Sequence, residues 1–81
     1  MTDETLTSWL LRTVSSYLDV PEAGIDPAVR LQALGLDSAH AMALCVDIEE
    51  RWGVLVDPAL VWDHPTINAI RKYLEGQLAA T

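Results

Sequence analysis

Apolar side chains recur at the spacing of an α-helix in three stretches of this 81-residue chain, with prolines and glycines between them. The first stretch predicts a helix from about Asp3 to Leu18, with Thr2 as its N-terminal cap and Pro21 as its stop. Its apolar stripe consists of Leu6, Leu10, Val14 and Leu18. The spacing of this stripe is typical of a helix that packs one face against the core of a small domain.

The second helix is predicted from about Ser38 to Arg51, after a long connection that spans residues 21–37. Asp37 is a good candidate for its N-cap, and Gly53 ends it. Long connections are uncommon in small domains and are often functional or held in place by their own side chains. The residues that can hold this one are Ile25, Leu31, Leu34 and Leu36.

Prolines delimit the last two helices. Pro58 opens a short helix that reaches about Trp62, because proline is favoured at a first helical position. Thr66 then caps a final helix from about Ile67 to Leu78, and residues 54–56 are expected to form a packed connection. The sequence therefore predicts a single all-α domain over residues 1–81: a four-helix bundle with a long loop between helices 1 and 2 and a short third helix.

Twelve acidic side chains outnumber five basic ones, which gives a net charge of −7. Such a charge repels nucleic acid and anionic membranes, so neither is expected as a partner. The apolar fraction of 51% is too high for a disordered acidic tail. The acidity either attracts proteins with basic patches or only keeps the domain in solution, and both interpretations stay open.

Cys45 is the only cysteine, so neither an internal disulfide nor a zinc cluster is expected. It falls among the core positions of the second helix, where it acts as a small hydrophobe. The acidic N-terminus lacks the features of a signal peptide, and no apolar run approaches the length of a transmembrane helix. We therefore expect a cytoplasmic protein without a metal site.

The second helix carries a mixed stripe of apolar and acidic residues beside Ser38. On a helical wheel this stripe comprises Met42, Val46, Glu49 and, farther round, Glu50. A partner with an apolar pocket and a rim of arginine or lysine would fit it. Alternatively, Met42 and Val46 extend the core beneath the long loop, as apolar residues at helical spacing usually do.

Asp37, Ser38 and His40 suggest a hydrolase triad, but their spacing argues against one. Residues two apart on a helix do not face each other, whereas a triad needs the imidazole within reach of the hydroxyl. We therefore predict no hydrolase activity. Ser38 is either a structural helix-start serine or, if Asp37 supplies the cap, a hydroxyl free for modification. A phosphodiester would suit this helix N-terminus, which favours anions.

Three segments resemble acyl carrier proteins, in order and at the spacing of that family. They are Leu31-x-x-Leu34-Gly35-Leu36-Asp37-Ser38, Ile48-Glu49-Glu50-Arg51-Trp52-Gly53-Val54 and Val61-Trp62-Asp63-His64-Pro65-Thr66-Ile67. The last is similar to the carriers of modular polyketide and peptide synthases, and Gly-Leu-Asp-Ser favours acyl over peptidyl carriers. The resemblance covers nearly the whole chain and implies the same four-helix fold.

The resemblance also implies that Ser38 carries 4′-phosphopantetheine, installed from coenzyme A by a phosphopantetheinyl transferase. The thiol of this arm would hold an acyl or aminoacyl unit as a thioester. The expected partners are that transferase, an acyltransferase or an acyl/aminoacyl ligase, and a ketosynthase. The residues expected to contact them are Leu36, Asp37, Ala39, Met42, Val46, Glu49, Glu50 and Asp63.

Two residues depart from the family's pattern. Ala39 stands where the family usually has leucine, and His40 stands where it is often acidic or polar. Ala39 offers partners a smaller apolar contact, and protonation of His40 would weaken the local negative charge below about pH 6.5. Together these departures suggest a specialised set of partners.

We therefore expect a discrete, monomeric, non-catalytic acyl carrier protein of polyketide-type biosynthesis, such as an antibiotic pathway. The methionine start and the four-helix length favour a freestanding protein, although a domain excised from a synthase would look similar. Two alternatives stay open. One is a peptidyl or aminoacyl carrier of a nonribosomal peptide synthetase, and the other is a helical interaction module without a prosthetic arm.

Overall fold

Four α-helices make up most of residues 5–79, the part of the chain that the computed structural model describes. They are α1 (Leu6–Leu18), α2 (Ser38–Trp52), α3 (Leu60–Asp63) and α4 (Ile67–Ala79). Two 3₁₀ turns, η1 (Glu22–Gly24) and η2 (Leu31–Leu34), lie in the connection between α1 and α2, and no β-strand occurs within residues 5–79. The predicted all-α bundle with a long first loop and a short third helix is confirmed.

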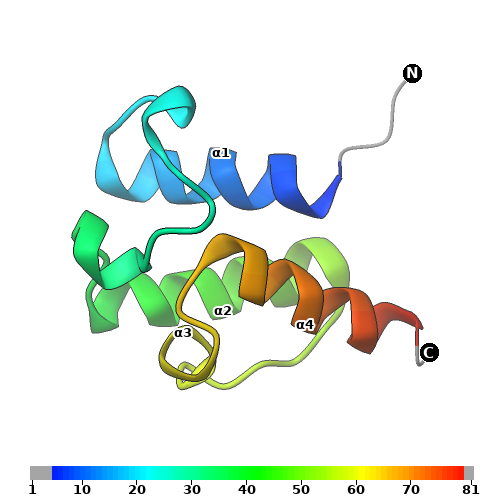
Figure 1. The fold of residues 1–81 in the computed structure, drawn as a ribbon. Coiled ribbons are helices and arrows are strands. Elements are labelled where there is room, and N and C mark those ends of the chain that lie inside the picture. Colours follow the sequence, from blue (N-terminus) through cyan, green and yellow to red (C-terminus); the bar gives the residue numbers. More distant parts are fainter. Residues whose placement is uncertain (1–4, 80–81) are drawn as a thin grey trace.

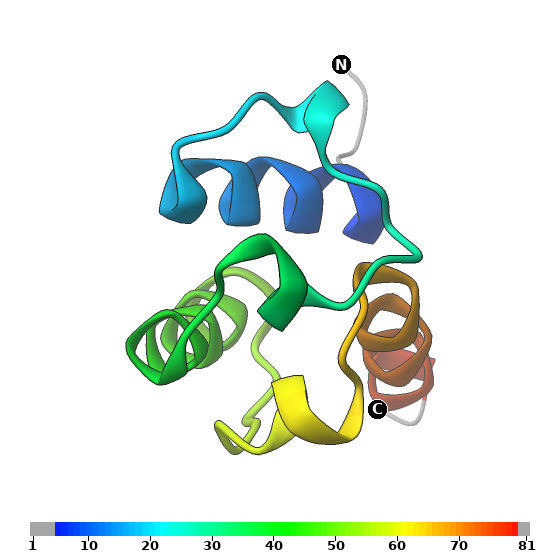
Figure 2. The same cartoon turned by 60° about the vertical axis from the view of Figure 1, so that its left-hand side comes forward.

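Helix α1 packs against both α2 and α4 (Figure 1). Figure 2 shows α2 and α4 on opposite sides of the molecule, with α1 covering the top and α3 closing the bottom. In the same view the connection after α1 descends past α4 and enters the space between the helices at η2. The chain then turns outward into the start of α2, which is where the candidate serine lies.

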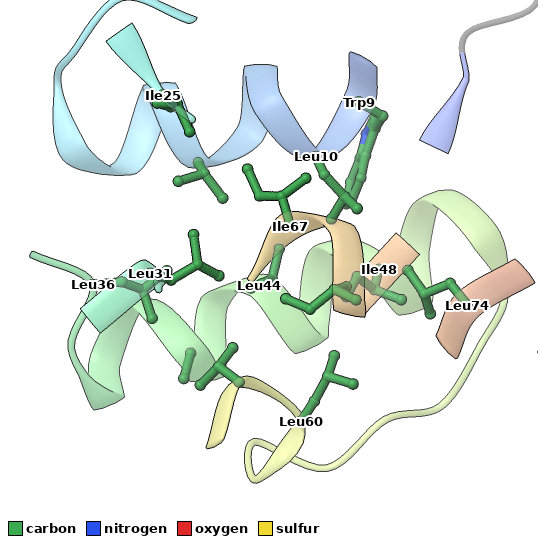
Figure 3. Close-up of a cluster of buried hydrophobic side chains, with 14 of the residues drawn as sticks. Trp9, Leu10, Ile25, Leu31, Leu36, Leu44, Ile48, Leu60, Ile67 and Leu74 are labelled. Carbon is green, nitrogen blue, oxygen red and sulfur yellow. The ribbon is translucent and has the colours of Figure 1, made fainter. Parts of the chain in front are cut away.

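The core gathers apolar side chains from all four helices and from the long connection (Figure 3). The largest completely buried ones are Leu10, Val14, Leu31, Leu44, Ile48, Val61, Ile67, Ile70 and Leu74. Each contributes about 1.5–3 kcal/mol of hydrophobic stabilisation. The predicted stripe of α1 places Leu10 and Val14 in this core, and Leu6 and Leu18 pack at its edge.

The long connection is held from inside, as predicted. Ile25, Leu31 and Leu36 are buried, and Leu34 is half-buried. Two backbone hydrogen bonds also tie the connection to the start of α4. The N–H of Leu31 donates to the carbonyl of Pro65 at 2.7 Å, and the N–H of Asn68 donates to the carbonyl of Pro27 at 3.1 Å. These contacts therefore fix the conformation of the connection that precedes Ser38.

Helices α2 and α4 begin where the sequence predicts, and each ends one residue later than expected. Helix α2 runs from Ser38 to Trp52, and Gly53 ends it in the left-handed conformation (φ 72°), which suits glycine. Thr66 caps α4, because its Oγ1 accepts a hydrogen bond at 3.0 Å from a backbone N–H of the first turn. Helix α4 ends at Ala79.

Helix α1 begins at Leu6 within the described residues, because Thr5 is its cap. Oγ1 of Thr5 accepts a hydrogen bond at 3.1 Å from a backbone N–H of the first turn. The predicted start at Asp3 and the predicted cap Thr2 lie outside the described residues. The helix ends at Leu18, as predicted.

Helix α3 begins two residues later than predicted, at Leu60 instead of Pro58. The carboxylate of Asp57 accepts a hydrogen bond from the N–H of Ala59, and its carbonyl accepts one from the N–H of Leu60, both at 2.8 Å. These bonds fold residues 57–59 into a turn that precedes the helix. The prediction that Pro58 is the first helical residue was therefore wrong, because Pro58 lies in this turn. Helix α3 ends at Asp63.

Candidate functional site

Ser38 is the first residue of α2, and its side chain is exposed. Within residues 5–79, no hydrogen bond engages its hydroxyl group. The backbone N–H groups of a first helical turn have no partner inside the helix, and the helix dipole favours negative charge there. The position therefore combines an accessible hydroxyl with surroundings that suit a phosphodiester.

Asp37 caps the N-terminus of α2, and the hydroxyl of Ser38 takes no part in this cap. Oδ1 of Asp37 accepts a hydrogen bond from the N–H of His40 at 2.9 Å, and the N–H of Asp37 donates to Nδ1 of His40 at 3.3 Å. Together they form a capping box in which histidine replaces the usual glutamate or glutamine. The hydrogen bond from the His40 N–H is the main reason that the pKa of Asp37 is lowered. The predicted N-cap is thus confirmed.

His40 faces Asp37 and the end of α1. Its ring stacks on Tyr17, with ring centroids 5.8 Å apart and planes inclined by 10°. The hydroxyl of Tyr17 donates a hydrogen bond to Asp47, and burial followed by this bond raises the pKa of Tyr17. A Ser–His–Asp triad instead requires the imidazole to contact the serine hydroxyl. The geometry of Asp37, Ser38 and His40 is therefore that of a helix cap.

The stripe of α2 beside Ser38 lies on the surface. Met42 is 61% exposed and Val46 is 54% exposed, and Glu49 and Glu50 are exposed as well. The alternative in which Met42 and Val46 extend the core beneath the loop is therefore wrong. Two apolar side chains one helical turn apart, with carboxylates next to them, form a surface suited to an apolar pocket with a basic rim.

The remaining residues expected to meet partners divide between surface and core. Asp37 and Ala39 are exposed at the start of α2, and Asp63 is exposed at the end of α3. Leu36 is only 3% exposed and packs in the hydrophobic core. The expectation that its side chain contacts partners is therefore corrected, because it holds the connection from inside.

Three further side chains were not predicted to be exposed or to join helices. Leu55, in the connection before α3, is 77% exposed, and Trp62 on α3 is 53% exposed. Residues 54–56 thus form a connection that packs on one side only, since Val54 is buried. The third is Tyr17, whose contacts with α2 lie far away in sequence. Of these three, only the exposure of Trp62 could have been suspected from the sequence, because a helix of a single turn offers little room to bury a large aromatic side chain.

A small cavity in the described part of the chain lies apart from Ser38. A cavity of about 100 Å³ lies between α3 and α4, where Leu60, His64 and Tyr73 line it, and Ser38 is not part of its wall. Within residues 5–79, no group of three or more His, Cys, Asp or Glu side chains could hold a metal ion. The helices in that part of the chain are also too short or too polar to cross a membrane. The surface around Ser38 is therefore the candidate site.

The family model for the phosphopantetheine attachment site matches residues 8–74 of the chain. The matched span contains the whole of α2, including Ser38 at its start.

Similar sequences occur in large synthases. The chain is 32% identical to a 6-methylsalicylic acid synthase of Arthrobotrys oligospora over 76 residues, which are 93% of this chain. It is 35% identical to a phenolphthiocerol/phthiocerol polyketide synthase of Mycobacterium tuberculosis over 69 residues, which are 85% of this chain. The chain spans only 4% of the length of each of these relatives.

Two solved structures share the fold along nearly their whole length. A free-standing peptidyl carrier protein from a secondary metabolic pathway of Acinetobacter baumannii is 32% identical, with a TM-score of 0.86 and coverage of 94% of this chain and 99% of that one. The acyl carrier protein LipD from Actinoplanes friuliensis is 30% identical, with a TM-score of 0.74 and coverage of 100% and 99%. The fold built around Ser38 is thus that of known carrier proteins.

Proposed function

Because the chain belongs to the phosphopantetheine attachment site family, we propose that Ser38 is the residue that holds its 4′-phosphopantetheine arm. The observation that carries this proposal is the separation of two roles between neighbouring residues. Asp37 caps α2, while the exposed hydroxyl of Ser38 stays uncommitted at the same helix end. These residues fit the group, because a phosphodiester on Ser38 would lie where the helix dipole favours an anion.

The chain's own residues position the arm, which when bound supplies a thiol for thioester formation. Asp37 holds the first turn of α2, and the hydrogen bond from Tyr17 to Asp47 fixes α2 to α1. The imidazole of His40 is engaged in the cap, so activation of the serine hydroxyl falls to the transferase that brings coenzyme A. The domain is accordingly a non-catalytic carrier.

The cargo that we propose is an acyl unit of polyketide-type biosynthesis. The names of the similar synthases support this class, as does the Gly35-Leu36-Asp37-Ser38 motif of the chain. The similarity to a free-standing peptidyl carrier protein supports a second candidate, an aminoacyl carrier loaded by a ligase. The likeness to that free-standing protein also supports a discrete carrier, and we propose the cytoplasm as its location.

The enzymes that act on the arm dock, in this proposal, on the exposed surface around Ser38. The surface comprises Asp37, Ala39, Met42, Val46, Glu49, Glu50 and Asp63. Its carboxylates steer basic partners, and its two large apolar side chains fill a pocket in the partner. The partners are a phosphopantetheinyl transferase, an acyltransferase or acyl/aminoacyl ligase, and a ketosynthase.

Intact-mass measurement tests the attachment site. The chain is incubated with coenzyme A and a promiscuous phosphopantetheinyl transferase, and wild type is expected to gain one phosphopantetheinyl group. Ser38→Ala is expected to gain nothing, whereas the control Ser16→Ala, at an exposed serine of α1, gains the group as wild type does. A wild-type chain that gains no mass would support the interaction module without an arm.

The cargo needs a second measurement. The chain is purified from its native producer with the thioester intact, and the mass of the ejected arm is determined. An acyl adduct supports the polyketide assignment, whereas an aminoacyl adduct supports the peptide synthetase alternative.

A further inference from the structure

Tyr17 connects the end of α1 to two turns of α2. Its ring stacks on His40 at 5.8 Å, and its hydroxyl donates to Asp47. His40 and Asp47 are seven residues apart, which places them on the same face of the helix about two turns from each other. The end of α1 lies above the start of α2 in Figure 1, so this one side chain joins both helices next to Ser38.

His40 in turn completes the cap on the other side of Ser38. Its Nδ1 accepts a hydrogen bond from the N–H of Asp37 at 3.3 Å and lies 3.1 Å from Oδ1 of the same residue. Nδ1 is the acceptor in the first of these contacts, which requires the ring to be held in one orientation. The stacked ring of Tyr17 holds that orientation.

We infer that His40 and Tyr17 are positioning residues for the modification of Ser38, an inference that rests on the proposed function of that serine. Ser38 lies between the two residues of the capping box, so the box fixes the backbone that carries its hydroxyl. Loss of the His40 ring leaves the N–H of Asp37 without its acceptor and loosens the first turn of α2. A transferase that requires the hydroxyl in one place then works more slowly.

The test compares rates of modification between variants. We measure kcat/KM for transfer from coenzyme A by a promiscuous transferase, with the full chain at neutral pH. His40→Gln keeps an acceptor for the Asp37 N–H, so it is the conservative variant that should preserve the rate. His40→Ala and Tyr17→Leu remove the cap acceptor and the stacked ring, respectively.

His40→Gln is expected to match wild type within about twofold, and His40→Ala and Tyr17→Leu to be about fivefold slower. Equal rates for wild type and His40→Ala, or a His40→Gln variant as slow as His40→Ala, would overturn the inference.

Two controls keep the result interpretable. Circular dichroism shows whether each variant is folded at the assay temperature, and if His40→Ala is not, the comparison of wild type with Tyr17→Leu still decides. A wild-type chain that takes no arm overturns the proposed function together with this inference. A wild-type chain that takes the arm at a rate that is insensitive to His40 overturns this inference alone.

Discussion

The carboxylate of Asp37 accepts a hydrogen bond from the backbone N–H of His40 at 2.9 Å, so the cap of α2 does not depend on the serine between them. In many helices a serine at the start of the helix has to satisfy the first turn itself. Here the neighbouring residue does so, and the hydroxyl of Ser38 stays free of the scaffold. This separation lets the serine be modified at little cost to the fold.

Substitution of the two neighbours should therefore affect stability differently. Ser38→Ala is expected to change the free energy of unfolding by no more than about 0.5 kcal/mol, because it removes no hydrogen bond of the cap. Asp37→Ala is expected to lower the melting temperature clearly, because the His40 N–H loses its acceptor. Thermal melting at neutral pH checks both variants. A destabilised Ser38→Ala with an unchanged Asp37→Ala would show that the serine is the true cap.

The lowered pKa of Asp37 predicts a dependence of stability on acid. The cap bond from His40 favours the charged carboxylate in the folded state, so its stabilisation is complete above the ordinary aspartate pKa of about 3.9. It is lost as pH falls through the lower pKa of the folded state. Asp37→Asn keeps a capping side chain without a charge. The melting temperature of wild type should exceed that of Asp37→Asn at pH 7, and this margin should close well below pH 4.

The exposed apolar pair on α2 should matter for partners and not for folding. Met42→Ala and Val46→Ala are expected to cost no more than about 0.5 kcal/mol of stability, because both side chains are largely exposed. The matched control is Leu44→Ala on the same helix, where a completely buried side chain is removed at a cost of about 2–5 kcal/mol. Isothermal titration with a carrier-modifying enzyme should show weaker binding for the first two variants. Unchanged affinity for both would remove this pair from the docking surface.

Charge reversal on α2 should slow the encounter with basic partners. Glu49→Lys is expected to lower the association rate severalfold, because exposed charges next to an interface act mainly on the rate of encounter. Glu22→Lys in η1 changes the net charge equally at another exposed place and serves as the control. Stopped-flow binding at low salt, with melting curves alongside, measures both effects. An equal slowing by the two variants would mean that only net charge matters.

The single cysteine provides an independent readout of the arm. Burial, with a smaller effect of Asp57, raises the pKa of the Cys45 thiol, so little reactive thiolate forms near neutral pH. The unmodified chain should therefore react slowly with Ellman's reagent. After modification, one fast-reacting thiol should appear, which belongs to the arm. A fast reaction of the unmodified chain would contradict the buried position of Cys45.

The features that the sequence predicted correctly have local signals. Asp37 and Gly53 delimit α2, and Thr66 starts α4, because caps and left-handed glycines act within a few residues of themselves. The start of α3 was missed because the same Asp57-Pro58 pair that can open a helix can also form a turn.

The site itself was only partly predictable. A motif identifies the position of Leu36 but not the direction of its side chain, which the packing of the connection turns into the core. The helical wheel allowed Met42 to lie either in the core or on the surface. It is exposed because no neighbouring element covers that face of α2, which the wheel cannot predict. The stacking of Tyr17 on His40 joins residues that are far apart in the chain, and no local pattern encodes such a contact.

The central claim is that one hydroxyl, that of Ser38, anchors the prosthetic arm. The most direct measurement is tandem mass spectrometry of the chain after incubation with coenzyme A and a transferase, with digestion to peptides and ejection of the arm during fragmentation. We predict that the ejected phosphopantetheine comes from the peptide that contains Ser38 and from no other. An arm on a different residue, or a fully unmodified Ser38 peptide, would contradict the account.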